Sequence, residues 1–260
     1  MKKVTVLKTA NLIGFLGTIA VNALANTLPI NGWTTGALSD RYPNLFVPAG
    51  LTFSVWGAIY LLLGAFIVYQ LAAGRNADRA VERVGGWFVL SSLLNVGWIF
   101  AWHYLQVALS LAIMIALLLT LIAIYLRLRI GKEAAETAER FFVRLPFSVY
   151  LGWISIATIA NASAVLVNAG WRGGPFSEQF WTVAVVLIGA ALTIAVVLTR
   201  TDIGYGMVVI WAYVGIILKR SSAPPADDGP VTWAAAVGIG LIVAAMIIAE
   251  LRKGMRERPA

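Results

Sequence analysis

The sequence predicts an all-α membrane protein, a polytopic helical bundle with about eight transmembrane helices. Of its 260 residues, 60% are hydrophobic and 12% are charged, whereas a soluble domain carries about 25% charged residues. The apolar residues gather in long blocks, and the mean hydropathy is +0.83. Lys and Arg fall mainly in alternate connectors between these blocks. Because a helical span needs about 20 apolar residues, each block is long enough to cross a bilayer.

The eight apolar blocks are separated by turn-forming residues. They run over 9–29, 49–73, 84–104, 107–127, 146–168, 180–199, 203–219 and 231–250. The connectors contain the helix breakers Asn31-Gly32, Gly74, Gly173-Gly174-Pro175 and Pro224-Pro225. The connectors at 105–106 and 200–202 are so short that the helices on either side must be antiparallel neighbours. Blocks of this length differ from the alternating strands of an outer-membrane barrel, so all eight are expected to be helices.

The basic residues predict the orientation of the bundle. If the N-terminus lies in the cytoplasm, 16 of the 20 Lys and Arg residues fall on the cytoplasmic side and four on the other side. Cytoplasmic loops of membrane proteins carry an excess of Lys and Arg, so both termini are expected to be cytoplasmic, in a bacterial cytoplasmic membrane. The net charge of +8 is therefore a sign of topology. A lipid bilayer is the expected surrounding, and no nucleic-acid partner is expected.

The start of the chain allows a second interpretation. Lys2 and Lys3, an apolar stretch and the tripeptide 23–25 (Ala-Leu-Ala) together resemble a secretory signal with its cleavage site. Cleavage would leave seven spans without changing the side of any later loop. The apolar stretch continues past the cleavage site, so the working interpretation is that the first span is retained.

Several chemistries are missing from the expected spans. The chain has no Cys, and the cores of the eight blocks contain no Asp, Glu, Lys or Arg. Proton relays, ion-coupled transporters and voltage sensors carry such intramembrane charges, and a retinal protein needs a Lys within a helix for its Schiff base. No P-loop, HExxH or GxSxG motif occurs. These absences leave open a carrier of neutral or amphipathic cargo, and they predict no metal site.

The single histidine, His103, follows Trp102 at the outer end of the third block. An interfacial histidine bonded to water or to a lipid headgroup is the expected role. Axial ligation of a haem iron is the alternative.

The ten Trp residues divide into two groups by position. Those near span ends form the expected aromatic belt at the membrane interface, and they are Trp33, Trp87, Trp102, Trp171, Trp181 and Trp233. Those inside spans are Trp56, Trp98, Trp153 and Trp211. A buried indole N–H needs a hydrogen-bond partner, so an interior Trp is a more specific feature than a Trp of the belt.

Three spans carry aromatic stripes at helical spacing. The stripes are Trp56 with Tyr60, then Asn95 with Trp98 and Trp102, and Trp153 with Ala157 and Asn161. An amide inside the membrane is costly unless it is hydrogen-bonded, so both Asn residues should face the bundle. They could serve only to join helices, but the three stripes together suggest an aromatic cavity for a flat, largely apolar ligand. The connector 30–48 is the longest on the outer side and is a natural lid for it.

These stripes resemble motifs of the translocator protein/tryptophan-rich sensory protein (TspO/MBR) family. The second-span pattern of the family is Pro-x-Trp-x-Phe-x-Pro-Val-Trp-x-x-x-Tyr. It is matched here by Pro48, Val55, Trp56 and Tyr60, while Gly50 and Ser54 replace its first Trp and second Pro and Phe53 is displaced by one position. The third-span pattern Leu-Asn-x-x-Trp is matched by Leu94, Asn95 and Trp98. The fifth-span pattern Trp-x-x-x-Ala-Thr-x-x-Asn is matched by Trp153, Ala157, Thr158 and Asn161.

The resemblance covers residues 1–168 and implies a five-helix ligand-binding core with a lid after the first helix. Residues 169–260 would add three transmembrane helices and a basic cytoplasmic tail. The implied ligand is a tetrapyrrole such as a porphyrin or haem, a sterol or another flat apolar molecule. The implied binding residues are Trp56, Tyr60, Asn95, Trp98, Trp153, Ala157 and Asn161. A homodimer is a further expectation.

Three functions stay open at this point. The first is a membrane ligand-binding or sensory protein, in which the tetrapyrrole is a ligand and no cofactor is required. The second is a transporter of an amphipathic molecule, which eight spans rather than five would favour. The third is a light- or haem-dependent enzyme, since some members of the family are described as degrading porphyrin with the two Trp residues that match Trp56 and Trp153. The motifs alone do not make the chain an enzyme.

Overall fold

The computed structural model describes residues 2–28, 30–222 and 229–256. Within these residues the regular structure is helical throughout, without strands. The eight long helices are α1 (Lys2–Thr27), α3 (Val55–Ala72), α5 (Trp87–His103), α6 (Val107–Arg127), α8 (Leu145–Asn168), α9 (Glu178–Arg200), α10 (Ile203–Ser221) and α11 (Gly229–Arg256). The short helical elements are η1 (Ile30–Gly32), α2 (Thr35–Asp40), η2 (Gly50–Ser54), α4 (Gly74–Val84), α7 (Thr137–Glu139) and the π-helical turn η3 (Arg140–Arg144).

The predicted blocks correspond one to one with the long helices. The largest differences lie at α1 and α11, which continue beyond their apolar blocks into the basic segments near the chain ends. Seven described helices are long and apolar enough to cross a membrane. The 17 residues of α5 extend only about 26 Å, and α5 is apolar and long enough only together with α4, from which it is bent by 57°. The described helices thus give seven spans, or eight if this bent pair crosses the membrane as one, which confirms the prediction of a polytopic bundle of about eight spans.

The bend between α4 and α5 has a local cause. Gly85 ends α4 at φ +58°, a left-handed backbone conformation that glycine adopts at little cost. Before it, α4 carries Arg75, Arg79 and Arg83, which an apolar span would not tolerate. The chain therefore leaves the basic helix at Gly85 and enters the apolar span at Trp87.

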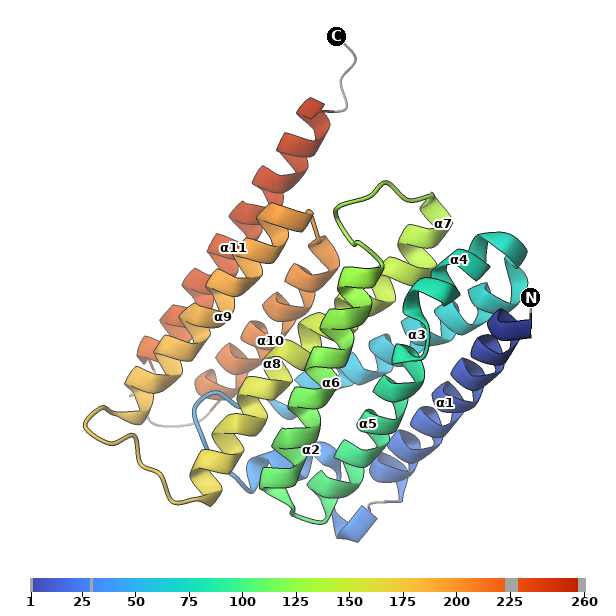
Figure 1. Cartoon of the computed structure of the whole chain (residues 1–260). Helices are drawn as coiled ribbons and strands as arrows, with labels where there is room; N and C mark the ends of the chain where they lie inside the picture. The colour runs from blue at the N-terminus through green and yellow to red at the C-terminus, as the bar shows by residue number, and fades with distance from the viewer. Residues whose placement is uncertain (1, 29, 223–228, 257–260) are drawn as a thin grey trace.

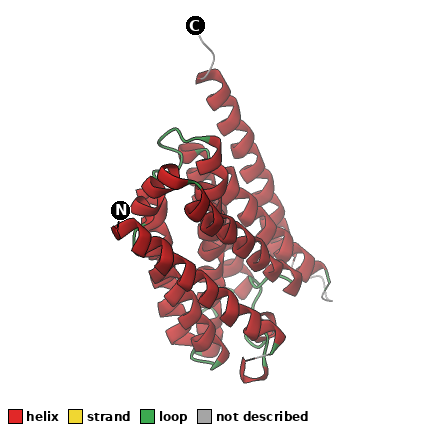
Figure 2. Cartoon of the chain, turned by 90° about the vertical axis from the view of Figure 1, so that its right-hand side faces the viewer, coloured by secondary structure: helices red, strands yellow, loops and turns green. Residues whose placement is uncertain are grey.

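The helices form two packed groups (Figure 1). In the first group, α5 packs against α1 and α6, and α8 packs against α3 and α6. In the second, α11 packs against α9 and α10. The helix that joins them is α10, which lies against α8, while α9 and α11 lie at the edge of the bundle. Seen from the side, α11 extends beyond the other helices (Figure 2).

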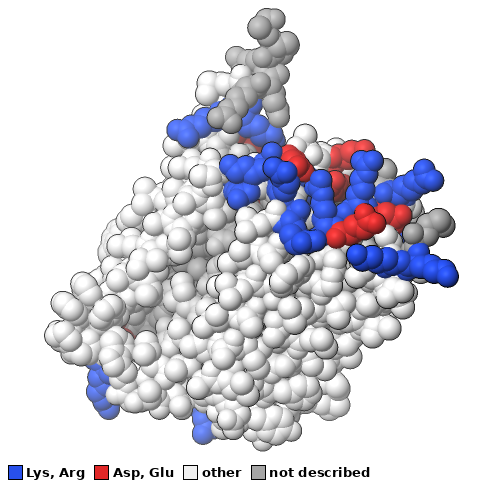
Figure 3. Space-filling view, viewed as in Figure 1, with Lys and Arg blue, Asp and Glu red and all other residues white. Residues whose placement is uncertain are grey.

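The charged side chains gather at one end of the bundle. Figure 3 shows Lys and Arg, with Asp and Glu among them, around the end where α1 begins and α11 ends. The opposite end and the sides of this view are nearly free of charge. An integral membrane protein with its basic loops on one side has this distribution.

Glycine allows the second group of helices to pack closely around Tyr213. This side chain is fully buried, and its hydroxyl donates to the carbonyl oxygen of Val186 at 2.5 Å. A Cβ added at Gly238 would lie 2.9 Å from the Tyr213 ring, and one at Gly189 would lie 2.6 Å from its hydroxyl. Small residues at such contacts let transmembrane helices approach each other closely.

We expect Gly238→Ala to destabilise this helix packing by about 1–3 kcal/mol through overpacking against the Tyr213 ring. The matched control is Gly240→Ala on the same helix, where an added Cβ meets nothing within 4 Å. Both substitutions gain the same helix propensity, so the difference between them isolates the contact. Thermal unfolding in detergent measures it, and equal midpoints for the two variants would contradict the close packing.

Candidate functional site

The predicted aromatic stripes meet in one cluster centred on Trp56 of α3. Its ring stacks on Tyr60 with a centroid distance of 5.6 Å and on Trp98 of α5 at 6.2 Å. Two rings of α8, Tyr150 and Trp153, each meet it edge-on at 6.1 Å. The three stripes therefore face one another, as expected for the wall of an aromatic cavity.

The cluster extends toward the lid through Trp102 and Phe53. Trp102 stacks on Trp98 at 6.0 Å, and Phe53 meets Trp153 at 6.0 Å. The prediction that Trp102 belongs to the aromatic belt is wrong, because the segment after α1 covers it and leaves it 5% exposed. The other five residues assigned to the belt are all exposed.

The two predicted intramembrane amides are buried and hydrogen-bonded. Asn161 accepts from Trp98 Nε1 at 3.1 Å and donates to Ser110 Oγ at 3.0 Å. Asn95 accepts from Asn22 Nδ2 at 2.8 Å and donates to Tyr150 Oη at 3.0 Å. These bonds join α1, α5, α6 and α8, so the amides hold the helices together at the level of the aromatic cluster.

A small cavity of about 40 Å³ lies inside the cluster. Five of the seven predicted site residues line it, namely Trp56, Trp98, Trp153, Ala157 and Asn161. The other two stand behind this wall, because Tyr60 stacks on Trp56 and Asn95 bonds to Tyr150. The other lining residues, which were not among the seven implied binding residues, are Thr35, Ser39, Pro48, Phe53, Trp102, Ile156 and Ala160.

Some of these missed residues carried a signal. Trp102 continues the stripe of Trp98, and Ile156 and Ala160 lie beside the stripe of Trp153 on α8. Thr35, Ser39 and Pro48 come from the segment expected to act as a lid, where no periodicity shows which side chains point inward. Their place in the cavity wall shows that this segment does cover the cluster.

In the cavity wall, Trp153 has a buried polar atom without a hydrogen-bond partner. It is 2% exposed, and its Nε1 has no hydrogen-bond partner. The indole N–H of Trp98, in the same wall, is bonded to Asn161. Leaving a buried donor without a partner costs about 1–3 kcal/mol. The residues that line the cavity therefore include a buried indole donor without a partner.

His103 joins the first part of the lid to α5. It is fully buried, and its Nδ1 lies 3.1 Å from the carbonyl oxygen of Ile30, so this nitrogen must carry the proton. In the neutral ring its Nε2 accepts from the Thr35 hydroxyl at 3.1 Å. The prediction of an interfacial histidine bonded to water or to lipid headgroups is therefore wrong. With both nitrogens engaged, His103 also has none free for a haem iron in this closed arrangement.

The second part of the lid is tied to α9 and α10. Within the lid, Asn44 Oδ1 accepts from the backbone N–H groups of Phe46 and Val47 at 3.1 and 3.0 Å, which makes the turn a folded unit. Two contacts join the lid itself to these helices, Asp40 with Lys219 at 2.6 Å and Leu45 N with Glu178 Oε1 at 3.2 Å. Two more join the residues directly after it, Ala49 N with Gly215 O at 2.9 Å and Trp211 Nε1 with Thr52 O at 3.0 Å. The second group of helices thus holds the lid that covers the aromatic cluster of the first group.

A larger cavity, of about 560 Å³, lies farther along α8 toward α9. Ser163 in its wall is one turn beyond Ala160 in the wall of the aromatic cavity. The lid borders both cavities, since Asn44 lines the larger one and Pro48 lines the smaller one. The remaining wall includes Trp171, Trp181 and the charged residues Arg172 and Glu178.

These features define a helical integral membrane protein with an aromatic cavity beneath a lid. The family model for TSPO-like proteins matches residues 8–248. The chain therefore belongs to the TSPO-like family, which confirms the resemblance of its motifs. The matched range includes α9, α10 and most of α11, so it extends well beyond residue 168. Comparisons with curated proteins and with solved structures gave no match.

We expect His103→Leu to loosen the first part of the lid, because the substitution removes both ring contacts while keeping an apolar side chain. The loss of two hydrogen bonds predicts roughly tenfold faster amide hydrogen exchange over residues 30–41. Exchange in α9 is the internal control and should not change. Unchanged exchange in the lid would show that His103 does not hold it.

Proposed function

We propose that the protein binds a flat, largely apolar ligand of the tetrapyrrole class between α3, α5 and α8, as a membrane ligand-binding or sensory protein. The observation that carries this proposal is the unpartnered Nε1 of Trp153 in a wall formed mainly by aromatic rings. Stacked and edge-on rings suit a planar ligand. The indole N–H suits an acceptor atom at its edge.

The small cavity must enlarge to hold such a ligand. Its 40 Å³ is enough for a few water molecules, whereas pockets for small organic ligands measure about 300–1,000 Å³. Displacement of the lid segment between Asn44 and Pro48 would join it to the neighbouring cavity of 560 Å³. The combined space is of the size that a tetrapyrrole needs. In it Arg172 lies at the opposite wall, where it suits an anionic substituent of the ring.

The cavities along α8 favour binding over transport in this arrangement. At its other end, α8 borders a third cavity that reaches Ser148. Tyr150 and Leu151, between Ser148 and Trp153 in the sequence of α8, are buried. Among the described residues, the aromatic cavity and the cavity at the basic end share no lining residue.

We expect Trp153→Phe to weaken the binding of protoporphyrin IX about fivefold, the effect of losing one hydrogen bond of about 1 kcal/mol. The substitution keeps an aromatic ring and removes only the N–H and part of the ring surface. Saturable quenching of Trp fluorescence, titrated in detergent, measures the dissociation constant.

The matched control for this titration is Trp233→Phe, which removes an indole that is 72% exposed on α11. It lowers the total fluorescence in the same way and should leave the dissociation constant unchanged. Quenching that does not saturate in the parent protein would refute the proposed function. Equal affinity of the two variants would place the ligand away from Trp153.

We expect a covalent link between the lid and α10 to abolish binding, because the lid must move for the ligand to enter. The chain has no Cys, so Asp40→Cys with Lys219→Cys can be joined selectively by a reducible bifunctional thiol reagent. The control pair is Lys8→Cys with Asp78→Cys, which replaces an ion pair of similar length, 2.7 Å, at the other end of the bundle. Loss of binding should occur only in the first pair and should reverse on reduction. Full binding by the linked lid would contradict entry past it.

A further inference from the structure

A second site lies at the basic end of the bundle, far from the aromatic cavity. A cavity of about 530 Å³ is bounded there by the loop after α6, the start of α8, the turn between α9 and α10, and α11. Its basic lining residues are Lys132, Arg140, Arg144, Arg200, Arg252 and Lys253. Glu133 and Asp202 are its acidic lining residues. The lining therefore carries a clear excess of positive charge.

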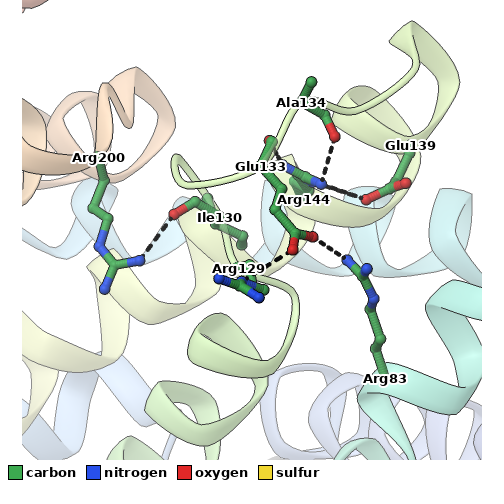
Figure 4. Close-up of polar contacts among 8 residues, drawn as sticks. All are labelled: Arg83, Arg129, Ile130, Glu133, Ala134, Glu139, Arg144 and Arg200. Carbon is green, nitrogen blue, oxygen red and sulfur yellow. Dashed lines mark hydrogen bonds and ion pairs between the residues drawn. The ribbon is translucent and has the colours of Figure 1, made fainter.

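The carboxylates near this cavity are already engaged. Glu133 pairs with Arg83 at 3.0 Å and with Arg129 at 3.1 Å (Figure 4). Asp202 accepts from Ser148 Oγ at 2.7 Å and from the backbone N–H of Tyr205 at 3.1 Å, so it serves as the N-terminal cap of α10. Glu133 is thus neutralised by arginines that do not line the cavity, and Asp202 alone adds an unpaired negative charge against the six basic residues.

Several of these cations have no carboxylate partner. Within the described part of the chain, Lys132, Arg140 and Arg252 form no ion pair within 4.0 Å, and Lys253 only reaches Glu250 at 4.0 Å. Arg200 donates to the carbonyl oxygen of Ile130 at 3.3 Å and lies over the Tyr125 ring, and it pairs with no carboxylate of the described residues. Like charges around one partly enclosed space repel each other with less screening than in open water. A bound anion would remove this repulsion.

The wall formed by the α6–α8 loop is rigid and does not depend on a ligand. The buried Arg144 side chain forms an ion pair with Glu139 at 2.8 Å (Figure 4). It also donates to the carbonyl oxygen of Glu133 at 2.6 Å and to that of Ala134 at 3.4 Å. Gly131 adopts φ +72°, and any side chain there would collide with the backbone of Arg200. The loop is thus fixed against the end of α9, and the cavity exists as a formed space.

We propose that this cavity binds the phosphate group of an anionic ligand, either a phospholipid headgroup or a soluble phosphate compound. Apolar wall residues Leu145, Leu198 and Ala249 lie beside the cations, so the space can accept a phosphate together with an apolar chain. Basic pockets between transmembrane helices at the cytoplasmic side bind acidic headgroups in this way. Because the wall comes from both helix groups, the ligand stabilises the packing of the two groups against each other.

The test is thermal unfolding of the full-length protein in a neutral detergent, with added phosphatidylglycerol, phosphatidylcholine or inorganic phosphate at fixed ionic strength. The variant Arg252→Gln with Lys253→Gln removes two cations from α11, one exposed and one partly buried. We expect its apparent affinity for the anion to be about 10–30-fold weaker. The control variant, Lys2→Gln with Lys3→Gln, removes two charges from α1 at the same end and should bind as the parent does.

The two ligands separate the two sources of phosphate. Stabilisation by phosphatidylglycerol alone identifies a lipid site, and equal stabilisation by inorganic phosphate identifies a soluble ligand. Either result supports the site if the α11 variant weakens the stabilisation by the anion and the α1 variant does not. Arg140→Gln changes another wall of the cavity, and it should independently weaken the binding of the same anion. The site is refuted if neither anion stabilises the parent, or if both double variants weaken binding equally.

Discussion

Polar groups inside the hydrocarbon region must find partners within the protein, and this constraint fixes the centre of the bundle. Asn95 connects α1 with α8, through Asn22 on one side and Tyr150 on the other. Asn161 on α8 connects α5 with α6 through Trp98 and Ser110. Once these bonds are made, the rotation of α5 and α8 about their axes is set. The aromatic side chains one turn away then have to meet, which is why a single cluster forms.

Helix positions were predictable from the sequence because hydrophobic length and turn residues act locally. The spacing of Trp98 and Asn161 also indicated correctly that these residues face the bundle. Spacing along a helix does not show how deep a side chain lies or which residue it contacts. For this reason the sequence predicts Tyr60 and Asn95 in the cavity wall, although they stand behind it. The buried position of Trp102 depends on a lid that has no periodic pattern. The bend before α5 likewise depends on one glycine and on the basic helix α4.

The three last helices have a structural relation to the lid that the five-helix motifs did not suggest. Glu178 of α9 holds the backbone of Leu45, and α10 holds the residues directly after the lid, at Ala49 and Thr52, through a backbone carbonyl and an indole N–H. Two of these contacts use a backbone group of this segment and a side chain of the added helices, and the third joins two backbone groups. A change in the packing of α9 and α10 would therefore reach the outer part of the aromatic cavity directly.

The rigid and movable parts of the site follow from how α8 is held. Gly152 brings α8 so close to α10 that a Cβ there would lie 3.0 Å from the carbonyl oxygen of Tyr205. The Tyr205 hydroxyl also donates to Ser155 at 3.0 Å, so two neighbouring turns of α8 are fixed to α10. Opening the cavity by moving α8 would break this packing. The link of the lid to α10 includes the exposed ion pair of Asp40 with Lys219, and a surface ion pair contributes only about 0–1 kcal/mol. The wall formed by α8 with Trp153 is therefore fixed to α10, and the proposed entry of a ligand is past the lid.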